Sequence, residues 1–473
     1  MAAVDAALRS PSVAVSPAVR PAAEATAADV IAEIFDRTDK REKFIPVTRE
    51  AIMERLTRPH SWPGQDGAEA RRFFRYLDYW RQQTYTARLL ELETDYEPFN
   101  PDSDLLVSRT FTPEERLHKQ QRLVANMTKL LEQANYTRID TDRVELILTS
   151  DSHYGLDLHV DLSAFDELQI FYRGASKRTE SRRDIRKLYL KHEEIDVPIF
   201  QRLCVMFKLK ADDVRIREVM VQRGCNRKEA EKIVKRLRSM LPPQIKSDYI
   251  YLKLFKNMPR SDIEMVFPNT RVRFRLFDKI RLGVTAGSGL GMGVFGTVGK
   301  IVVASNPIAL AGAMLGLCGI AFRQATSFLN QRNRYMMTMA QNLYFHALAD
   351  NRGVTTLLAN RAAEEDIKEE MLLYNVMAKE RVARSDLGDI DRAIEQYILN
   401  TFNVSVNFDL EDALSRLMAD GLVTEKDGVF ETLGPKAAAQ HIDVKWDKYL
   451  DELPDQTRNE GVEFDKDTGE AVN

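Results

Sequence analysis

The clearest candidates for chemistry are two aspartates and a histidine that alternate along one predicted strand. Asp157, His159 and Asp161 are spaced two residues apart, and side chains at that spacing share one face of a β-strand. Carboxylate and imidazole groups together can bind a divalent metal. No second ligand cluster is identifiable as their partner, so a solvated strand face is the alternative. We predict no catalytic residue, no cofactor and no metal, and keep these three residues as the metal candidates.

A glycine pattern raises the question of nucleotide binding. Residues 291–296 read Gly-Met-Gly-Val-Phe-Gly, which matches the dinucleotide fingerprint. That fingerprint requires a preceding strand and a soluble βαβ unit, whereas these glycines lie inside a continuous apolar run. Gly299 and Lys300 are followed by Ile301 rather than by serine or threonine, so the phosphate-loop pattern also fails. The sequence favours helix packing over nucleotide binding here.

The apolar run extends over residues 282–322 and carries one formal charge, Lys300. Two helices of about 20 residues could cross a bilayer from this length, and Asn306-Pro307 suits the turn between them. Glycines at four-residue spacing let helices approach closely in lipid. We therefore predict a transmembrane hairpin that forms a homo-oligomer. The predicted packing residues are Gly283, Gly287, Gly289, Gly291, Gly293, Gly312 and Gly316.

Basic residues flank the apolar run and set its predicted orientation. Positive residues near membrane spans stay on the cytoplasmic side. The sequence thus predicts a two-pass integral membrane protein with both termini cytoplasmic, in a bacterial inner membrane or, in a eukaryote, the mitochondrial inner membrane. The residues expected to contact lipid headgroups are Arg271, Arg273, Arg275, Lys279, Arg281, Lys300 and Arg323.

Composition limits the function classes. The formal net charge is −3 and the isoelectric point is near 6.3, which argues against a bulk nucleic-acid-binding protein. The three cysteines, Cys204, Cys225 and Cys318, are far apart and form no disulfide framework or metal spacing. We expect membrane lipids and an unknown protein as partners, and no nucleic acid.

The predicted fold class is an α+β membrane protein with N-terminal helices, an antiparallel-sheet α+β domain, a two-helix transmembrane hairpin, and C-terminal helices with a winged-helix-like unit. Strands are expected at Val144–Leu148, Leu156–Leu162, Glu167–Arg173, Val197–Leu209 and Tyr249–Phe255. The expected boundaries are a disordered extension at 1–27, a helical region at 28–134, an α+β cytoplasmic domain at 135–281, the transmembrane hairpin at 282–322, a helical hairpin at 323–385, the winged-helix-like unit at 386–450 and a disordered acidic tail at 451–473.

Three segments rich in charged residues each allow a functional interpretation and a purely structural one. Aromatic residues interleaved with arginines at 71–81 could bind single-stranded nucleic acid, but helical spacing favours an amphipathic core helix. The acidic run at 364–370 is expected to be a solvated face. The would-be recognition helix of the winged-helix-like unit carries Asp409, Glu411, Asp412 and Asp420 against Arg416. Phosphate repulsion therefore favours packing or protein contact over DNA binding.

Several ordered motifs resemble a known family. They are residues 251–259 (YLKLFKNMP), 262–268 (DIEMVFP), 332–335 (RNRY), 342–345 (NLYF), 351–354 (NRGV), 364–369 (EEDIKE), 412–414 (DAL) and 421–423 (GLV). The chain resembles, over roughly Val197–Leu433, the family with the domain of unknown function numbered 3754, which includes the transmembrane protein 143-like proteins of mitochondria. The resemblance implies a membrane protein with a helical hairpin; it implies no reaction, cofactor or catalytic residue.

Three functions compete. The first is a membrane-anchored structural or interaction protein, a scaffold, because anchoring features are abundant and catalytic ones are not. The second is an oligomeric channel or transporter built from the hairpin, with Lys300 near its mouth. The third is a membrane-associated enzyme, for which Asp157, His159 and Asp161 are the candidates.

Overall fold

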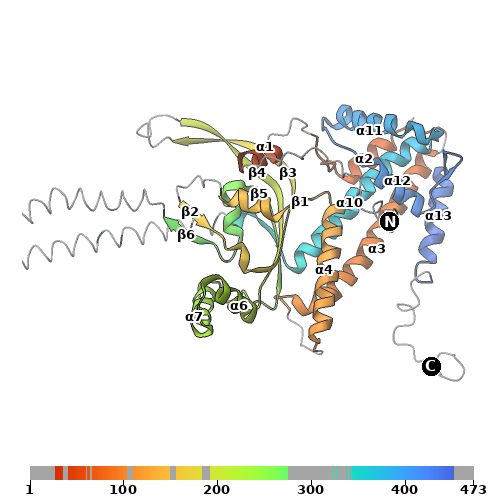
Figure 1. Cartoon of the computed structure of the whole chain (residues 1–473). Coiled ribbons are helices and arrows are strands. Elements are labelled where there is room, and N and C mark those ends of the chain that lie inside the picture. Colours follow the sequence, from red (N-terminus) through yellow and green to blue (C-terminus); the bar gives the residue numbers. More distant parts are fainter. Residues whose placement is uncertain are drawn as a thin grey trace, which may run out of the picture.

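The computed structural model describes the chain in several ranges. These are residues 27–35, 41–59, 61–63, 66–103, 110–149, 156–183, 192–274 and 343–451, with the single positions 323, 326, 337 and 341. Figure 1 shows a central sheet with a helical half on one side and a long strand hairpin that projects away from it.

The central sheet has five antiparallel strands in the order β1-β3-β4-β5-β7. The strands are β1 (Thr137–Ile139), β3 (Phe165–Arg183), β4 (His192–Leu209), β5 (Ile250–Pro259) and β7 (Ala347–Asp350). Alternate side chains face opposite sides, as the pleat requires. Phe171, Cys204 and Leu252 belong to one buried core, whereas Tyr172, Val205 and Tyr251 belong to another. The sheet therefore separates two hydrophobic cores.

Helices cover the two faces unequally. The larger core is built by α2 (Arg49–Leu56), α3 (Asp66–Tyr96), α4 (Pro113–Gln133), α10 (Arg352–Met377) and the C-terminal elements, which together form the helical half. The other face is covered by α1 (Ala27–Phe35), α5 (Thr141–Thr149) and the 3-10 segment η4 (Arg260–Val266). The hairpin of α6 (Asp212–Arg223) and α7 (Arg227–Arg238) forms a third, small core, and β2 (Leu156–His159) pairs with β6 (Arg271–Phe274) beside the sheet.

The C-terminal elements have winged-helix topology. After α10 come β8 (Val382–Ala383), α11 (Leu387–Phe402), α12 (Leu410–Ala419), β9 (Val423–Lys426), β10 (Val429–Thr432) and α13 (Pro435–Asp447). The small sheet has the order β8-β10-β9. Asp427 and Gly428 both have positive φ, at 52° and 74°, as a tight hairpin turn requires. The sequence predicts a hairpin with its turn at Lys426-Asp427-Gly428 and a short strand at 404–408. The hairpin is confirmed, but the strand is not; there, Val406 forms an isolated bridge with Glu42.

Local signals decide two other segments. Thr112 before Pro113 predicts an N-cap at the start of a helix, and Thr112 is the N-cap of α4. Its side chain and that of Glu115 also form a reciprocal capping box, which satisfies two backbone N–H groups. The predicted strand at Val144–Leu148 is wrong, because these residues lie in α5. Val144, Ile147 and Leu148 are all buried, and their spacing follows the helical period rather than the strand period.

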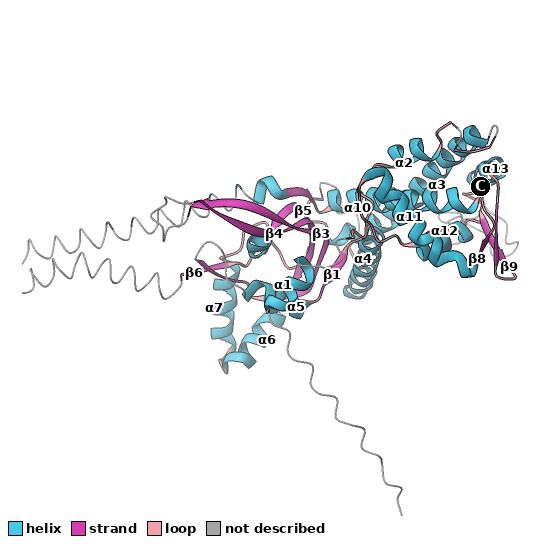
Figure 2. Cartoon of the chain, turned by 90° about the horizontal axis from the view of Figure 1, so that it is seen from above, coloured by secondary structure: helices cyan, strands magenta, loops and turns pink. Residues whose placement is uncertain are grey.

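The segment around Asn351 also differs from expectation. The sequence predicted a helix through Asp350 that ends at Asn351, yet residues 347–350 form β7 and α10 begins at Arg352. Asn351 has φ 46°; its backbone N–H donates to the Leu252 carbonyl at 2.8 Å and its Oδ1 accepts from the Leu252 N–H at 3.2 Å. Asn351 therefore fastens the end of β7 to β5 and turns the chain into α10. Figure 2 shows α10 in the helical half, away from the long hairpin of β3 and β4.

The membrane prediction is corrected by the helices that the structure describes. None of them combines the length and the apolar character that crossing a bilayer demands; α3 and α10 are long, but both carry charged residues along their length. This finding contradicts the membrane-protein fold class and the two-pass localisation, and neither is carried further. The predicted spans at 282–322 themselves lie outside the described residues.

Candidate functional site

The acidic run on α10 is the main departure from the sequence analysis, because it is buried rather than solvated. Glu365, Asp366, Glu369 and Glu370 are 3%, 2%, 4% and 0% exposed. Helix α10 is surrounded by α2, α3, α4 and α12, so it has no face left for water along this stretch. Burial of ionised carboxylates is unfavourable unless cations and hydrogen bonds compensate it. The compensation comes from residues far away in sequence.

Arg416 on α12 provides the central cation. Its Nε donates to Glu370 Oε1 at 2.8 Å, and its Nη2 donates to Glu369 Oε2 at 2.6 Å. Its Nη1 pairs with Asp366 Oδ1 at 3.2 Å and also with Asp412. One guanidinium thus contacts four carboxylates, which its planar array of five N–H donors makes possible.

Arg81 on α3 extends the network to a fifth carboxylate. Its Nη2 lies 2.8 Å from Glu370 Oε1 and 2.6 Å from Asp420 Oδ2. Asp420 also accepts from Trp80 Nε1 at 3.0 Å and from Lys445 Nζ at 2.9 Å. We call the following set the charge cluster: Arg81, Asp366, Glu369, Glu370, Asp412, Arg416, Asp420 and Lys445. It joins α3, α10, α12 and α13 at one point.

The charge cluster holds more negative than positive groups. Its five carboxylates face three cations, a formal excess of two negative charges if all were ionised. Burial raises the pKa of Asp366 to about 7, against the opposing effect of Arg416. Burial likewise raises the pKa of Glu369 to about 8. Two protons at these carboxyls would remove the excess, so the cluster is close to neutral when they are protonated.

Asp420 differs because its cations outweigh its burial. Burial alone would raise its pKa, but Arg81 and Lys445, with hydrogen bonds from Lys445 and Trp80, lower the pKa below the usual value. The Tyr85 hydroxyl donates to Asp366 Oδ2 at 2.8 Å. Burial and the neighbouring Asp366 raise the pKa of Tyr85, so it remains a donor at neutral pH.

Three members of the charge cluster also have the spacing of a cation site. One oxygen each of Asp366, Glu369 and Asp412 lies within 4.8 Å of the others. Arg416 already donates to all three carboxylates. A guanidinium in contact with every candidate ligand would repel a metal ion at the same place. The arrangement therefore fits a carboxylate shell around arginine, not a metal centre.

A second buried pair links α10 to the N-terminal segment. Glu365 Oε1 lies 2.9 Å from Lys368 Nζ and 3.4 Å from Arg173 Nη1. Glu365 Oε2 accepts from the Ile45 N–H at 3.1 Å, and Lys368 Nζ donates to the Ile45 carbonyl at 2.6 Å. These bonds hold residues 41–45 between α10 and the sheet.

The predicted metal candidates do not share one strand. Asp157 and His159 lie on β2, opposite Arg273 and Arg271 of β6, but Asp161 follows the end of that strand. Asp161 Oδ2 is paired with Arg215 Nη2 at 2.6 Å. The structure thus commits Asp161 to an ion pair, and the metal hypothesis for the three stays a prediction.

The predicted membrane residues fall mainly outside the described part. Arg271 and Arg273 lie on β6, and Arg323 is exposed, with its carbonyl accepting from Thr326 Oγ1 at 2.9 Å. The remaining headgroup candidates and all the packing glycines lie outside the described residues. These are Arg275, Lys279, Arg281, Lys300, Gly283, Gly287, Gly289, Gly291, Gly293, Gly312 and Gly316.

The aromatic and arginine-rich segment of α3 is a core helix. Phe73, Phe74 and Leu77 are fully buried, and Phe73 packs on Tyr374 of α10 with ring centroids 4.3 Å apart. Arg81 is 7% exposed, unlike the neighbouring surface arginines. Sequence reasoning missed the charge cluster. Apolar Ile367 and Met371 at i and i+4 also fit an amphipathic helix whose acidic face is solvated, so the local pattern does not show that the acidic residues are buried.

A family match covers the sheet. The family model described as "Protein of unknown function (DUF3754)" matches residues 165–353. The match begins before the resemblance expected from the sequence and ends before the motifs at 364–369, 412–414 and 421–423. The narrower likeness to transmembrane protein 143-like proteins stays a prediction. No solved structure matches the chain. The segment from β3 to β7 thus matches the model of the DUF3754 family of proteins of unknown function.

Proposed function

We propose that this chain is a structural or interaction protein. It is a scaffold in which the winged-helix unit is fixed against α3 and α10 and forms a platform for a protein partner. The observation that carries the proposal is the inward orientation of α12. Leu410, Ala413, Leu414 and Leu417 of this helix are buried, and Arg416 is bound by the acidic residues of α10. A helix that reads DNA presents its outward face to the major groove and to the phosphates beside it, and the exposed residues of α12 include the acidic Glu411 and Asp412.

The charge at the docking point supports the same conclusion. Glu411 and Asp412 are exposed on α12, where a nucleic-acid reader needs cations. The buried charged side chains there form ion pairs with one another, as expected of a contact that fixes the orientation of two units. The platform is therefore proposed for protein contact rather than for catalysis or nucleic-acid binding.

The test is crosslinking of the tagged full-length chain in cells, followed by affinity recovery and identification of partners. We expect a reproducible partner that is lost with Arg416→Met, which removes the central cation. Arg392→Gln is the matched control, because Arg392 forms an ion pair with Asp389 on the surface. Recovery of the wild-type chain as a monomer with no reproducible partner would overturn the proposal. The proposal would also be overturned if the purified chain bound duplex DNA and Arg416→Met abolished that binding.

A further inference from the structure

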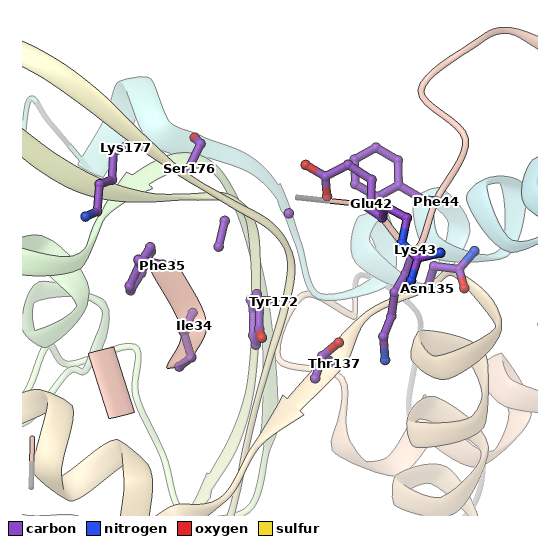
Figure 3. A pocket seen from close by; sticks show the side chains of 13 residues that line it. Ile34, Phe35, Glu42, Lys43, Phe44, Asn135, Thr137, Tyr172, Ser176 and Lys177 are labelled. Carbon is purple, nitrogen blue, oxygen red and sulfur yellow. The ribbon is translucent and has the colours of Figure 1, made fainter. Parts of the chain in front are cut away.

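A cavity of about 620 Å³ lies on the side of residues 41–44 away from the helical half. Figure 3 shows Ile34 and Phe35 of α1 on one side of this space and Lys43 with Asn135 on the other, with Tyr172 and Thr137 between them. The volume is in the range of cavities that hold small molecules. We call this cavity the basic pocket. Its lining residues are Ile34, Phe35, Arg41, Glu42, Lys43, Phe44, Asn135, Thr137, Tyr172, Gly174, Ala175, Ser176 and Lys177.

The lining of the basic pocket is cationic on balance. Arg41, Lys43 and Lys177 contribute three positive charges against one carboxylate, Glu42. Arg41 is paired with Glu395 of α11 at 3.2 Å. Lys43 is exposed, and in the described part of the chain no hydrogen bond or ion pair engages its ammonium group. This ammonium is available to an anion.

One wall of the basic pocket is apolar and preformed. Phe35 and Tyr172 both pack edge-on against Phe200, with ring centroids 4.7 Å and 5.3 Å apart. Phe200 is fully buried, so these contacts hold both rings in place. Ile34 and Ala175 complete the wall. A ligand with an apolar body would bury it here without reordering the side chains.

The backbone around the basic pocket is also held firmly. The Glu42 N–H donates to Ser405 O at 3.0 Å, and the Glu42 carbonyl accepts from Asn407 N–H at 2.8 Å. Gly174 has φ 72°, a conformation that glycine adopts without strain, and a Cβ there would lie 2.6 Å from Gln201 Oε1. Both walls are therefore set by contacts outside the cavity, as expected of a preformed site.

We propose that the basic pocket binds a small organic anion, with its anionic group at Lys43 and its apolar body against Ile34, Phe35 and Tyr172. Two sources offer this chemistry: an acyl chain with a carboxylate and a nucleoside phosphate. For either ligand, the cavity provides a cation for the anionic group and an apolar wall for the body. The proposal does not depend on the interaction role proposed above.

The test uses the fluorescent probe anilinonaphthalene sulfonate, which carries an aromatic body and one anionic group. We expect saturable binding to the full-length chain, about tenfold weaker with Lys43→Glu, because a charge-assisted contact is lost and repulsion is added. Thr137→Phe should also weaken binding by filling the space. Lys436→Glu is the matched control on α13; Lys436 is likewise exposed and lies outside the pocket.

Competition separates the two sources. Displacement of the probe by decanoate assigns an acyl carboxylate, and displacement by adenosine monophosphate assigns a nucleoside phosphate. Absence of saturable binding, equal binding to Lys43→Glu and Lys436→Glu, or displacement by neither compound would overturn the proposal. The two lysine variants change exposed residues, so circular dichroism should show the same fold for both.

Discussion

The charge cluster and the basic pocket are neighbours that handle charge in opposite ways. Asn135 touches both: its Nδ2 donates to Glu369 Oε1 at 3.4 Å, and its side chain lines the pocket. In the cluster, every charged group has a partner of opposite charge within the protein. In the pocket, Lys43 has none in the described part of the chain. Internally paired charge fixes one helix against another, whereas unpaired charge beside an apolar wall is what a ligand site requires.

Replacing the central cation should have the largest effect. Arg416→Met keeps an unbranched apolar stem but leaves four carboxylates without their shared guanidinium. Breaking a buried ion network by removing one partner costs about 3–5 kcal/mol. We expect a loss of that size in the free energy of unfolding, measured by urea denaturation.

The matched control for this change is Arg392→Met. Arg392 and its partner Asp389 are 73% and 77% exposed, and surface ion pairs contribute about 0–1 kcal/mol. Similar losses in the two variants would show that the charge cluster does not hold the helical half together, and the contrast between cluster and pocket would disappear.

How much of this could be predicted depends on the range of the interaction. The N-cap at Thr112 and the turn at Asp427-Gly428 are local, and the sequence predicts both. The bond from Asn351 to Leu252 and the contact of Arg81 with Asp420 join residues that are far apart in the sequence. No local periodicity reports such a pairing. The acidic run on α10 was read as solvated for the same reason.

The candidate site was missed in two different ways. For the charge cluster, the sequence predicts a solvated acidic run and a separate helix that carries Arg416. Nothing in a single sequence shows that Arg416 contacts Glu369 and Glu370. For the basic pocket, Lys43 and Lys177 have no distinguishing spacing. Only the fold brings the segment 41–44 and β3, which carries Lys177, to one cavity. The converse error was to expect Asp157, His159 and Asp161 on one strand, because β2 ends at His159.

The pH dependence of stability should be the next largest effect. Burial raises the pKa of Glu369 to about 8, above the value of about 4.3 expected in the unfolded chain. The folded state therefore holds a proton that the unfolded state releases, so this stability is complete below about pH 4 and is lost as the pH rises through 8. Glu369 alone should lower the free energy of unfolding by about 1.4 kcal/mol per pH unit between pH 5 and 7, and Asp366, whose pKa burial raises to about 7, adds a contribution of the same sign.

Glu369→Gln tests whether that slope comes from the proton. The amide has the shape of the neutral carboxyl, so the variant should lose part of the pH slope in urea denaturation series at successive pH values. An unchanged slope would mean that Glu369 is ionised in the folded state and belongs with the permanently charged members of the cluster.

The smallest expected effect concerns the basic pocket. Lys43→Gln removes an exposed ammonium that engages no group in the described residues. Surface substitutions of this kind change stability by less than about 0.5 kcal/mol, so the free energy of unfolding should match that of the wild type within that limit. A loss above 1 kcal/mol would show that Lys43 supports the fold, as the cluster residues do. A protein cation that serves only to bind a ligand can be removed without loss of stability in the free protein. Unchanged stability together with lost anion binding in Lys43→Gln would therefore distinguish the pocket from the cluster.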